Sequence, residues 1–314
     1  MALPFEWARR LRLPLIAAPM YQVSGPDLVI AACKAGVIGA FPTANCKSTD
    51  ELYAWLTRIK TSLLAADAPF CPNIIIRHEA MKSQLEVLVR HGVELVITSV
   101  GSPAPVVEPL HSIGCKVFAD VASLRHAHLA LEAGADGLVL LSAGAGGQTG
   151  WANGLAFGRA VRRFYDGPII LAGGVSDGHA LWAARVLGCD LGYMGTRFIA
   201  TNESMVTPEY RKMLVDSELD DVLLSSAFTG LPANMLRPSI VAAGLDPDDL
   251  PVDLSAEGAK RLFGQGGSAP QRWKQIWSAG HSVSGVVAAL SVADLVQQTL
   301  VEYDTARART RDLM

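Results

Sequence analysis

The sequence predicts an α/β protein built as a (β/α)₈ barrel, and three observations support this prediction. The chain has 314 residues, of which 50% are hydrophobic and only 18% charged, so it can form a large core. Short apolar runs alternate along it with segments of helical period. Eight such runs recur at spacings of roughly 20 to 35 residues, the length of one strand–helix unit. An open doubly wound sheet is the alternative.

The eight runs are apolar throughout instead of alternating with polar residues, which is typical of parallel strands covered on both faces. The predicted strands are 14–20, 37–41, 70–76, 95–100, 116–121, 137–142, 168–174 and 191–196. The intervening segments have helically spaced apolar residues and end in glycine. In 24–36, for example, Ser24 is the expected N-cap and Gly36 the expected stop.

The strand–helix rhythm ends near residue 204. Segment 205–274 contains a helical stretch, an irregular stretch and an acidic part rich in proline and glycine. Segment 275–314 returns to helical period. We therefore expect a barrel over 1–204, a small accessory or substrate region over 205–274 that caps the C-terminal face, and a return to the barrel with a C-terminal helix over 275–314.

Composition excludes several classes of function. The net charge is −3 and no cluster of lysine or arginine is present, so nucleic acid is not an expected partner. No apolar run reaches the length of about 18 residues that a membrane helix needs, and Glu6 and Pro14 interrupt the N-terminal segment, which argues against a signal peptide. The five cysteines are scattered without a CxxC pair, which favours a cytoplasmic location and argues against a metal site. A homodimer is compatible with these features.

Active sites of (β/α)₈ barrels lie where the strands end, so the residues at these ends are the candidates. They are Ala18, Pro19 and Met20 after the first strand, Asn73 in the third, Asp120 in the fifth, the loop 144–150 after the sixth, Gly173 and Gly174 after the seventh, and Gly195 and Thr196 after the eighth. Free backbone N–H groups after the last two strands predict a phosphate site. The alternative is that these glycines only form tight turns.

Other strand-end and histidine residues are weaker candidates. Ser99 and Ser142 end strands and could line the same pocket. His126 and His128 lie two apart on a predicted helix, so they do not share a face and do not form a metal site. His179 follows the Gly-Gly turn and is expected at the surface.

Taken together, five motifs resemble the nitronate monooxygenases, formerly called 2-nitropropane dioxygenases. These motifs are "AAPM", "AGVIGAF", "AGADGLVLLSAGAGGQTG", "ILAGGVSDG" and "GYMGTRFIATNES". The resemblance covers about residues 13–204 and returns at 277–285. FMN-dependent enoyl-acyl-carrier reductases and NADH:quinone reductases share the pattern.

The resemblance implies one FMN, bound without a covalent link. Its phosphate would lie at Gly173, Gly174, Gly195 and Thr196, and its ring beside Ala18, Pro19, Met20 and Asn73. Asp120 would accept a hydrogen bond from a ribityl hydroxyl or, alternatively, cap the helix that follows it at "DVAS".

In the family the glycine-rich loop passes close to the flavin ring and usually reads "AGGH". Here it reads Ala145-Gly146-Gly147-Gln148, and glutamine can form hydrogen bonds but cannot take a proton near neutral pH. Relatives often read "WSAGQ" near the C-terminus, where this chain has His281 after "WSAG". We hypothesise that glutamine and histidine have exchanged places, so that Gln148 orients the substrate and His281 supplies the acid/base group. The alternative is a solvated or structural His281.

The sequence thus predicts an FMN-dependent oxidoreductase of a small molecule, and oxidation of alkyl nitronates with O₂ is the leading expectation. The alternative is hydride chemistry with NAD(P)H on an enoyl thioester or a quinone. A third class, a flavin-free barrel that binds sugar phosphates or indoles, would explain the phosphate site but not "AAPM" and the glycine-rich loop. The yellow colour of a purified flavoprotein would separate this class from the first two.

Overall fold

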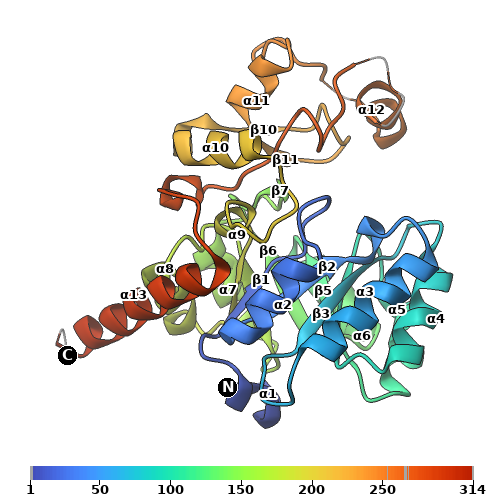
Figure 1. Ribbon diagram of the computed structural model, residues 1–314, viewed down its shortest axis with the longest axis vertical. Coiled ribbons are helices and arrows are strands. Elements are labelled where there is room, and N and C mark those ends of the chain that lie inside the picture. Colours follow the sequence, from blue (N-terminus) through green and yellow to red (C-terminus); the bar gives the residue numbers. More distant parts are fainter. Residues whose placement is uncertain (1–2, 253, 265–266, 268, 313–314) are drawn as a thin grey trace.

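A closed barrel of eight parallel strands forms the centre of the computed structural model, which describes residues 3–252, 254–264, 267 and 269–312 (Figure 1). The strands are β1 (Leu15–Ala17), β2 (Ile38–Pro42), β3 (Phe70–Ile75), β4 (Leu95–Ser99), β5 (Lys116–Val121), β6 (Gly137–Leu141), β8 (Ile169–Ala172) and β9 (Leu191–Met194). Pairing of β1 with β9, for example Leu15 with Gly192, closes the barrel. The predicted (β/α)₈ barrel and all eight strands are confirmed, and the open sheet is wrong.

Helices cover the outside of the barrel. They are α2 (Pro26–Ala35), α3 (Thr49–Ser62), α4 (Met81–His91), α5 (Ala104–His111), α6 (Leu124–Glu132), α7 (Gly154–Arg162), α8 (Gly178–Val186) and the short α9 (Thr196–Ile199), with α1 (Phe5–Arg10) before β1 and a 3₁₀ turn at Thr43–Asn45. The predicted cap of α2 is wrong: Gly25 is the N-cap, because Pro26 starts the helix one residue later. The hydroxyl of Ser24 instead donates to the carbonyl of Ala18. Gly36 ends α2 in the left-handed conformation, as predicted.

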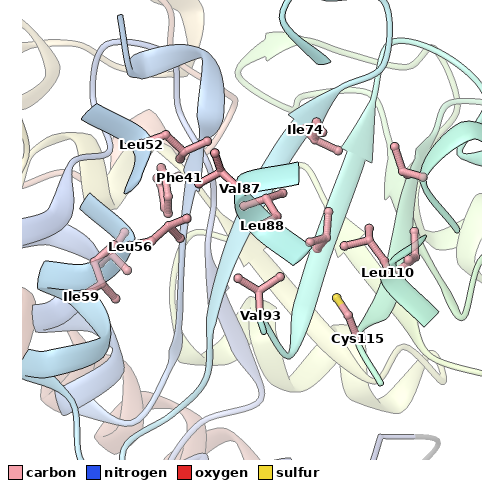
Figure 2. Packing of buried hydrophobic residues seen from close by; sticks show 14 of the residues in the cluster. Phe41, Leu52, Leu56, Ile59, Ile74, Val87, Leu88, Val93, Leu110 and Cys115 are labelled. Carbon is pink, nitrogen blue, oxygen red and sulfur yellow. The ribbon is translucent and has the colours of Figure 1, made fainter. Parts of the chain in front are cut away.

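The core has two layers because strand side chains alternate between the inside and the outside of the barrel. Interior residues such as Ile38, Phe118 and Ile170 form one buried cluster. Outward residues pack against the helices, and Figure 2 shows this for Phe41 and Ile74 with side chains from α3, α4 and α5. The interior of the barrel is therefore filled, and a site is expected at the carboxyl end of the strands, which is called the upper end below.

The accessory elements lie together at one end of the barrel (Figure 1). They are α10 (Pro208–Asp216), a 3₁₀ turn at Leu219–Asp221, β10 (Val222–Ser225), β11 (Ala233–Leu236), α11 (Arg237–Ala242) and α12 (Ala256–Phe263). A two-residue strand from the glycine-rich loop, β7 (Gly147–Gln148), pairs antiparallel with β11. The loop after β6 thus belongs to the same small sheet as the accessory region. The three-part division of the chain stays a prediction.

The last helix, α13 (Val292–Asp312), follows a 3₁₀ turn at Val283–Gly285 and packs against α8 and α2. Only glycine fits at position 178, because a Cβ there would lie 2.1 Å from the backbone nitrogen of Tyr303. Within the part of the chain that the structure describes, none of the helices combines the length and apolar character needed to cross a membrane.

Candidate functional site

Four strands of the barrel carry a polar residue at or near their carboxyl ends, on the side that faces the interior. Each lies two residues after an interior residue of the same strand, so it points inward at the upper end. The four are Asn73 of β3, Ser99 of β4, Asp120 of β5 and Tyr193 of β9. The predicted candidates Asn73 and Asp120 therefore share one end of the barrel.

Asn73 is held rigidly by its neighbours. It is 5% exposed, and its side-chain amide donates to the carbonyl of Ile97 and to the hydroxyl of Ser99, both at 3.2 Å. Its backbone carbonyl accepts a hydrogen bond from the hydroxyl of Thr43. A side chain fixed in this way presents its polar edge in one orientation.

One carboxylate oxygen of Asp120 is buried without a hydrogen bond. Its Oδ1 is buried and has no hydrogen-bond partner among the described residues. Burial raises the pKa of this carboxyl from 3.8 to about 7. The capping alternative is wrong, because Ser123 caps α6 and accepts from the backbone of His126 at 3.1 Å. Buried polar atoms in folded proteins nearly always have a partner, so a hydrogen-bond donor outside the chain fits here.

Tyr193 shares this end of the barrel with Asn73 and Asp120 and was not among the residues predicted from the strand ends. Burial raises the pKa of its phenol well above 10, and the nearby carboxyl of Asp120 raises it further. The alternation of side chains in β9 could have identified Tyr193, because it lies two residues after the buried Leu191 and therefore faces the same side of the strand.

The two glycines after β8 both have positive φ, at +110° for Gly173 and +73° for Gly174. A Cβ on Gly173 would lie 2.6 Å from the hydroxyl of Ser142, so the glycine allows a close approach to β6. A Cβ on Gly174 would meet no atom within 4 Å, so its backbone borders open space. The turn after β8 therefore combines a close approach to β6 at Gly173 with open space beside Gly174.

The first residue of α9 adds a hydroxyl. Thr196 is 3% exposed, and its Oγ1 accepts the backbone N–H of Gly280 at 2.9 Å, which leaves the hydroxyl proton free to donate. Two backbone N–H groups at the N-terminus of α8 already have acceptors, since Ala180 donates to the side chain of Asp177 and Gly178 donates to the side chain of Glu302. An anion is therefore better placed in the two loops than on that helix.

The residues after β1 lie next to the end of β9. The amide of Ala18 donates to the carbonyl of Met194 at 3.0 Å. A Cβ on Gly195 would be in ordinary contact with Ala18 and with the sulfur of Met20, at 3.7 and 3.5 Å. Pro19 follows between them and is partly exposed. Barrel closure thus joins the candidates of the first and the last strand.

The glycine-rich loop is packed by other parts of the chain. A Cβ on Gly146 would lie 2.8 Å from the backbone nitrogen of Gly280, so the two glycines let the two backbones touch. The carbonyl of Ala145 accepts a hydrogen bond from the buried side chain of Asn234 at 2.7 Å. Thr149 donates to the carbonyl of Pro232 in the accessory region. Much of the glycine content is thus required by chain packing.

His281 lies against this loop. Its backbone N–H donates to the carbonyl of Gly144 at 2.9 Å, and its Nδ1 lies 2.7 Å from the point where a Cβ on Gly144 would stand. Both His281 and Gln148 are exposed. Gln148 extends from β7 and pairs with Ala233. The structure therefore brings His281 to the first glycine of the loop that carries Gln148.

The remaining histidines lie elsewhere. His128 stacks on Phe164 with ring centroids 4.1 Å apart, beside a surface hollow of about 350 Å³ between α6 and α7. None of the strand-end candidates lines this hollow. His179 is exposed on α8. No cluster of metal-ligating side chains is found in the described part of the chain.

Comparison with known proteins identifies relatives. The family model described as nitronate monooxygenase matches residues 76–302. The chain is 29% identical over 231 residues to the (3aS,4S,5R,7aS)-5-hydroxy-7a-methyl-1-oxo-octahydro-1H-indene-4-carboxyl-CoA dehydrogenase of Mycobacterium tuberculosis, and 28% identical over 228 residues to that of Rhodococcus jostii. Each alignment covers 73% of this chain and 64% of the relative. The nitronate monooxygenase of Paraburkholderia phytofirmans is 25% identical in an alignment 282 positions long that covers 74% of this chain and 76% of that protein.

Two solved structures share the fold. FabK from Thermotoga maritima superposes with a TM-score of 0.79 at 23% identity and covers 98% of this chain and 97% of its own. A nitroalkane oxidase from Streptomyces ansochromogenes superposes with a TM-score of 0.79 at 24% identity and covers 97% and 99%. At these identities the likeness shows the fold alone.

Proposed function

Because the chain belongs to the nitronate monooxygenase family, a family of flavin-containing oxidoreductases, we propose that it is an FMN-dependent oxidoreductase that acts on a coenzyme A thioester. The observation that carries the choice of substrate is the position of His281 against the glycine-rich loop. Imidazole is the side-chain group that most often acts as a general acid or base in enzymes.

The residues at the barrel end fit FMN. The open backbone at Gly174 and the free hydroxyl proton of Thr196 suit a phosphate, and Gly173 and Gly195 complete the same two loops. The unmatched oxygen of Asp120 suits a ribityl hydroxyl. Ala18, Pro19, Met20 and Asn73 would border the ring, and the loop residues Ala145, Gly146 and Gly147 would lie close to it. FMN, when bound, supplies two-electron chemistry by accepting or giving a hydride.

The side chains of the protein supply orientation and a proton. Asn73 presents a fixed amide edge, and the exposed amide of Gln148 can hydrogen-bond a substrate carbonyl. His281 can hold the proton that the α-carbon of a thioester gains when its β-carbon gains a hydride, or take that proton in the reverse direction. The accessory strand β11 holds the loop in place because it pairs with β7.

Substrate chemistry favours the thioester. Reduction of a double bond beside a thioester needs one proton at the α-carbon for each hydride at the β-carbon, so an imidazole has a task. A nitronate is already deprotonated and needs no base. The carboxyl-CoA dehydrogenases among the relatives support the same choice.

Oxidation of a nitronate with O₂ is the second candidate. The family model and the relative from Paraburkholderia phytofirmans support it. In this reaction Gln148 would orient the nitro oxygens, and His281 would have no catalytic task.

An anaerobic experiment separates the two candidates. The purified yellow protein is mixed with NADH, with NADPH or with propionate-3-nitronate, and the flavin absorbance is followed. We expect a reduced nicotinamide to bleach the flavin, and crotonyl-coenzyme A to restore its colour without O₂. Bleaching by the nitronate alone would favour the second candidate, and a colourless protein would contradict both.

A further inference from the structure

The backbone that leads to His281 lies outside the regular elements. Residues 277–280 belong to none of the helices and strands of the described chain. Hydrogen bonds within a helix or a sheet therefore do not fix this segment, and its position depends on contacts with other parts of the chain. Because His281 follows directly, the same contacts decide where its imidazole lies.

Tyr210 of α10 makes two hydrogen bonds to one residue of this segment. Its hydroxyl donates to the carbonyl of Ser278 at 2.5 Å, and its oxygen accepts the N–H of Ser278 at 3.2 Å. Tyr210 is 6% exposed, and burial raises its pKa to about 12, so the phenol keeps its proton at neutral pH and remains a donor. One side chain thus fixes the peptide groups on both sides of Ser278.

The ring of Tyr210 adds a packing contact at the start of the segment. It stacks on the ring of Trp277, with centroids 4.8 Å and planes 11° apart. The N–H of Trp277 donates to the hydroxyl of Ser239 in α11 at 2.9 Å, and its carbonyl accepts the N–H of Leu236 at 2.8 Å. The accessory region therefore holds the segment by side-chain and backbone contacts.

The end of the segment is attached to the barrel. The N–H of Gly280 donates to the hydroxyl of Thr196, and the N–H of His281 donates to the carbonyl of Gly144, both at 2.9 Å. Ser278 precedes His281 by three residues, so a reorientation of its peptide groups displaces the residues that follow. The hydrogen bonds to Ser278 therefore restrain the same short stretch of backbone as the contacts of His281.

We propose that Tyr210 is a positioning residue for proton transfer, because its two hydrogen bonds fix the peptide groups around Ser278 and so hold the imidazole of His281 in its reactive orientation. This inference rests on the proposed function for the task of His281. A displacement of about 1 Å can lower the rate of a reaction about a hundredfold, so a hydrogen bond three residues away can affect catalysis. Helix α10 then contributes to the reaction from within the accessory region.

The substitution Tyr210→Phe keeps the ring on Trp277 and removes both hydrogen bonds. We expect kcat for thioester reduction to fall about ten- to hundredfold while KM stays nearly the same, because the loss concerns the orientation of the imidazole and not the binding of the substrate.

Tyr165→Phe is the matched control. The hydroxyl of Tyr165 donates to the carbonyl of Asp136 at 2.6 Å, and burial raises its pKa to about 12 as well. Asp136 comes directly before β6, at the amino end of the strands, and thus far from the proposed site. We expect Tyr165→Phe to lower the Tm to a similar extent as Tyr210→Phe and to leave kcat unchanged.

A double-mutant cycle shows whether Tyr210 acts through His281. Tyr210→Phe is introduced into the wild type and into His281→Ala, both loaded with FMN. We expect it to lower kcat in the wild type and to have almost no further effect in His281→Ala, where the imidazole is absent. An equal loss in both backgrounds would overturn the inference.

Hydrogen exchange gives a readout that does not depend on turnover. We expect Tyr210→Phe to speed exchange at the amides of Gly280 and His281 about tenfold or more, since removal of a buried hydrogen bond loosens the backbone that it held. Tyr165→Phe should leave exchange at both amides unchanged. Wild-type exchange at both amides in Tyr210→Phe would overturn the inference. Faster exchange in Tyr210→Phe would still support the positioning of His281 if the wild type failed to reduce the thioester, a failure that would contradict the proposed function alone.

Discussion

The side-chain amide of Asn234 in β11 donates a hydrogen bond to the backbone carbonyl of Ala145 at 2.7 Å and so joins segments that lie 89 residues apart. Both residues are buried. Since Ala145 begins the turn that leads into Gln148, the accessory sheet determines the shape of the loop predicted to face the substrate.

Replacement of Asn234 by leucine should loosen this loop. The carbonyl of Ala145 would lose its buried donor, which costs about 1–3 kcal/mol of unfolding free energy. We expect faster hydrogen exchange at Gln148 and a higher KM, measured with the flavin content unchanged. Unaltered exchange at Gln148 would contradict a role for Asn234 in shaping the loop.

A methyl group on Gly144 should displace His281. The Cβ of Gly144→Ala would lie 2.7 Å from Nδ1 of His281, at a φ of +90°. We expect a loss of about 1–3 kcal/mol of stability from backbone strain, together with a large loss of turnover. Gly114→Ala is the control, because Gly114 also has a positive φ but has no atom within 4 Å of a Cβ. It should lose stability and keep its turnover.

Removal of the imidazole tests the acid/base role directly. We expect His281→Ala to lower kcat about a hundredfold or more, the usual contribution of a general acid or base, with FMN still bound and the Tm unchanged. His179→Ala, an exposed histidine on α8, should have no effect. Intact turnover in His281→Ala would exclude the exchange of roles between Gln148 and His281.

Asp120 makes the stability of the flavin-free protein depend on pH. Its carboxyl releases a proton near pH 3.8 in the unfolded chain but near pH 7 in the folded protein. Between these values the folded state binds more protons, so its contribution to the unfolding free energy falls as the pH rises and is level above about pH 7.

Urea unfolding of wild type and Asp120→Asn from about pH 4 to 8 measures this dependence. The variant should gain stability relative to wild type up to about pH 7, by at most roughly 4 kcal/mol, since one pKa unit corresponds to about 1.4 kcal/mol. A difference that does not change with pH would show that the carboxyl of Asp120 is not shifted.

The hydroxyl of Thr196 should matter for both stability and the cofactor. Thr196→Val leaves the buried N–H of Gly280 without an acceptor and removes the donor predicted to face the phosphate. We expect about 1–3 kcal/mol less stability and weaker retention of FMN on ultrafiltration. Thr196→Ser keeps the hydroxyl and should behave like wild type. Equal FMN retention in Thr196→Val would move the phosphate site elsewhere.

Local sequence signals predicted the barrel correctly because the apolar pattern of a segment shows which of its faces will be buried. Apolar runs located all eight strands, and Gly36 located the end of α2. The N-cap at Ser24 was wrong, because Pro26 starts the helix and the hydroxyl of Ser24 binds a neighbouring loop. Asp120 was left between two interpretations, and the structure excludes the cap.

The sequence by itself predicted the eight strands and placed the candidate residues where these strands end, and it favoured a closed barrel over an open sheet. Only the tertiary structure decided that His281 touches Gly144 and that the side chain of Asn234 donates to the carbonyl of Ala145. The apolar pattern can be read within a short window of the sequence. These contacts instead join segments that lie far apart in the sequence, and the sequence does not show that the segments meet.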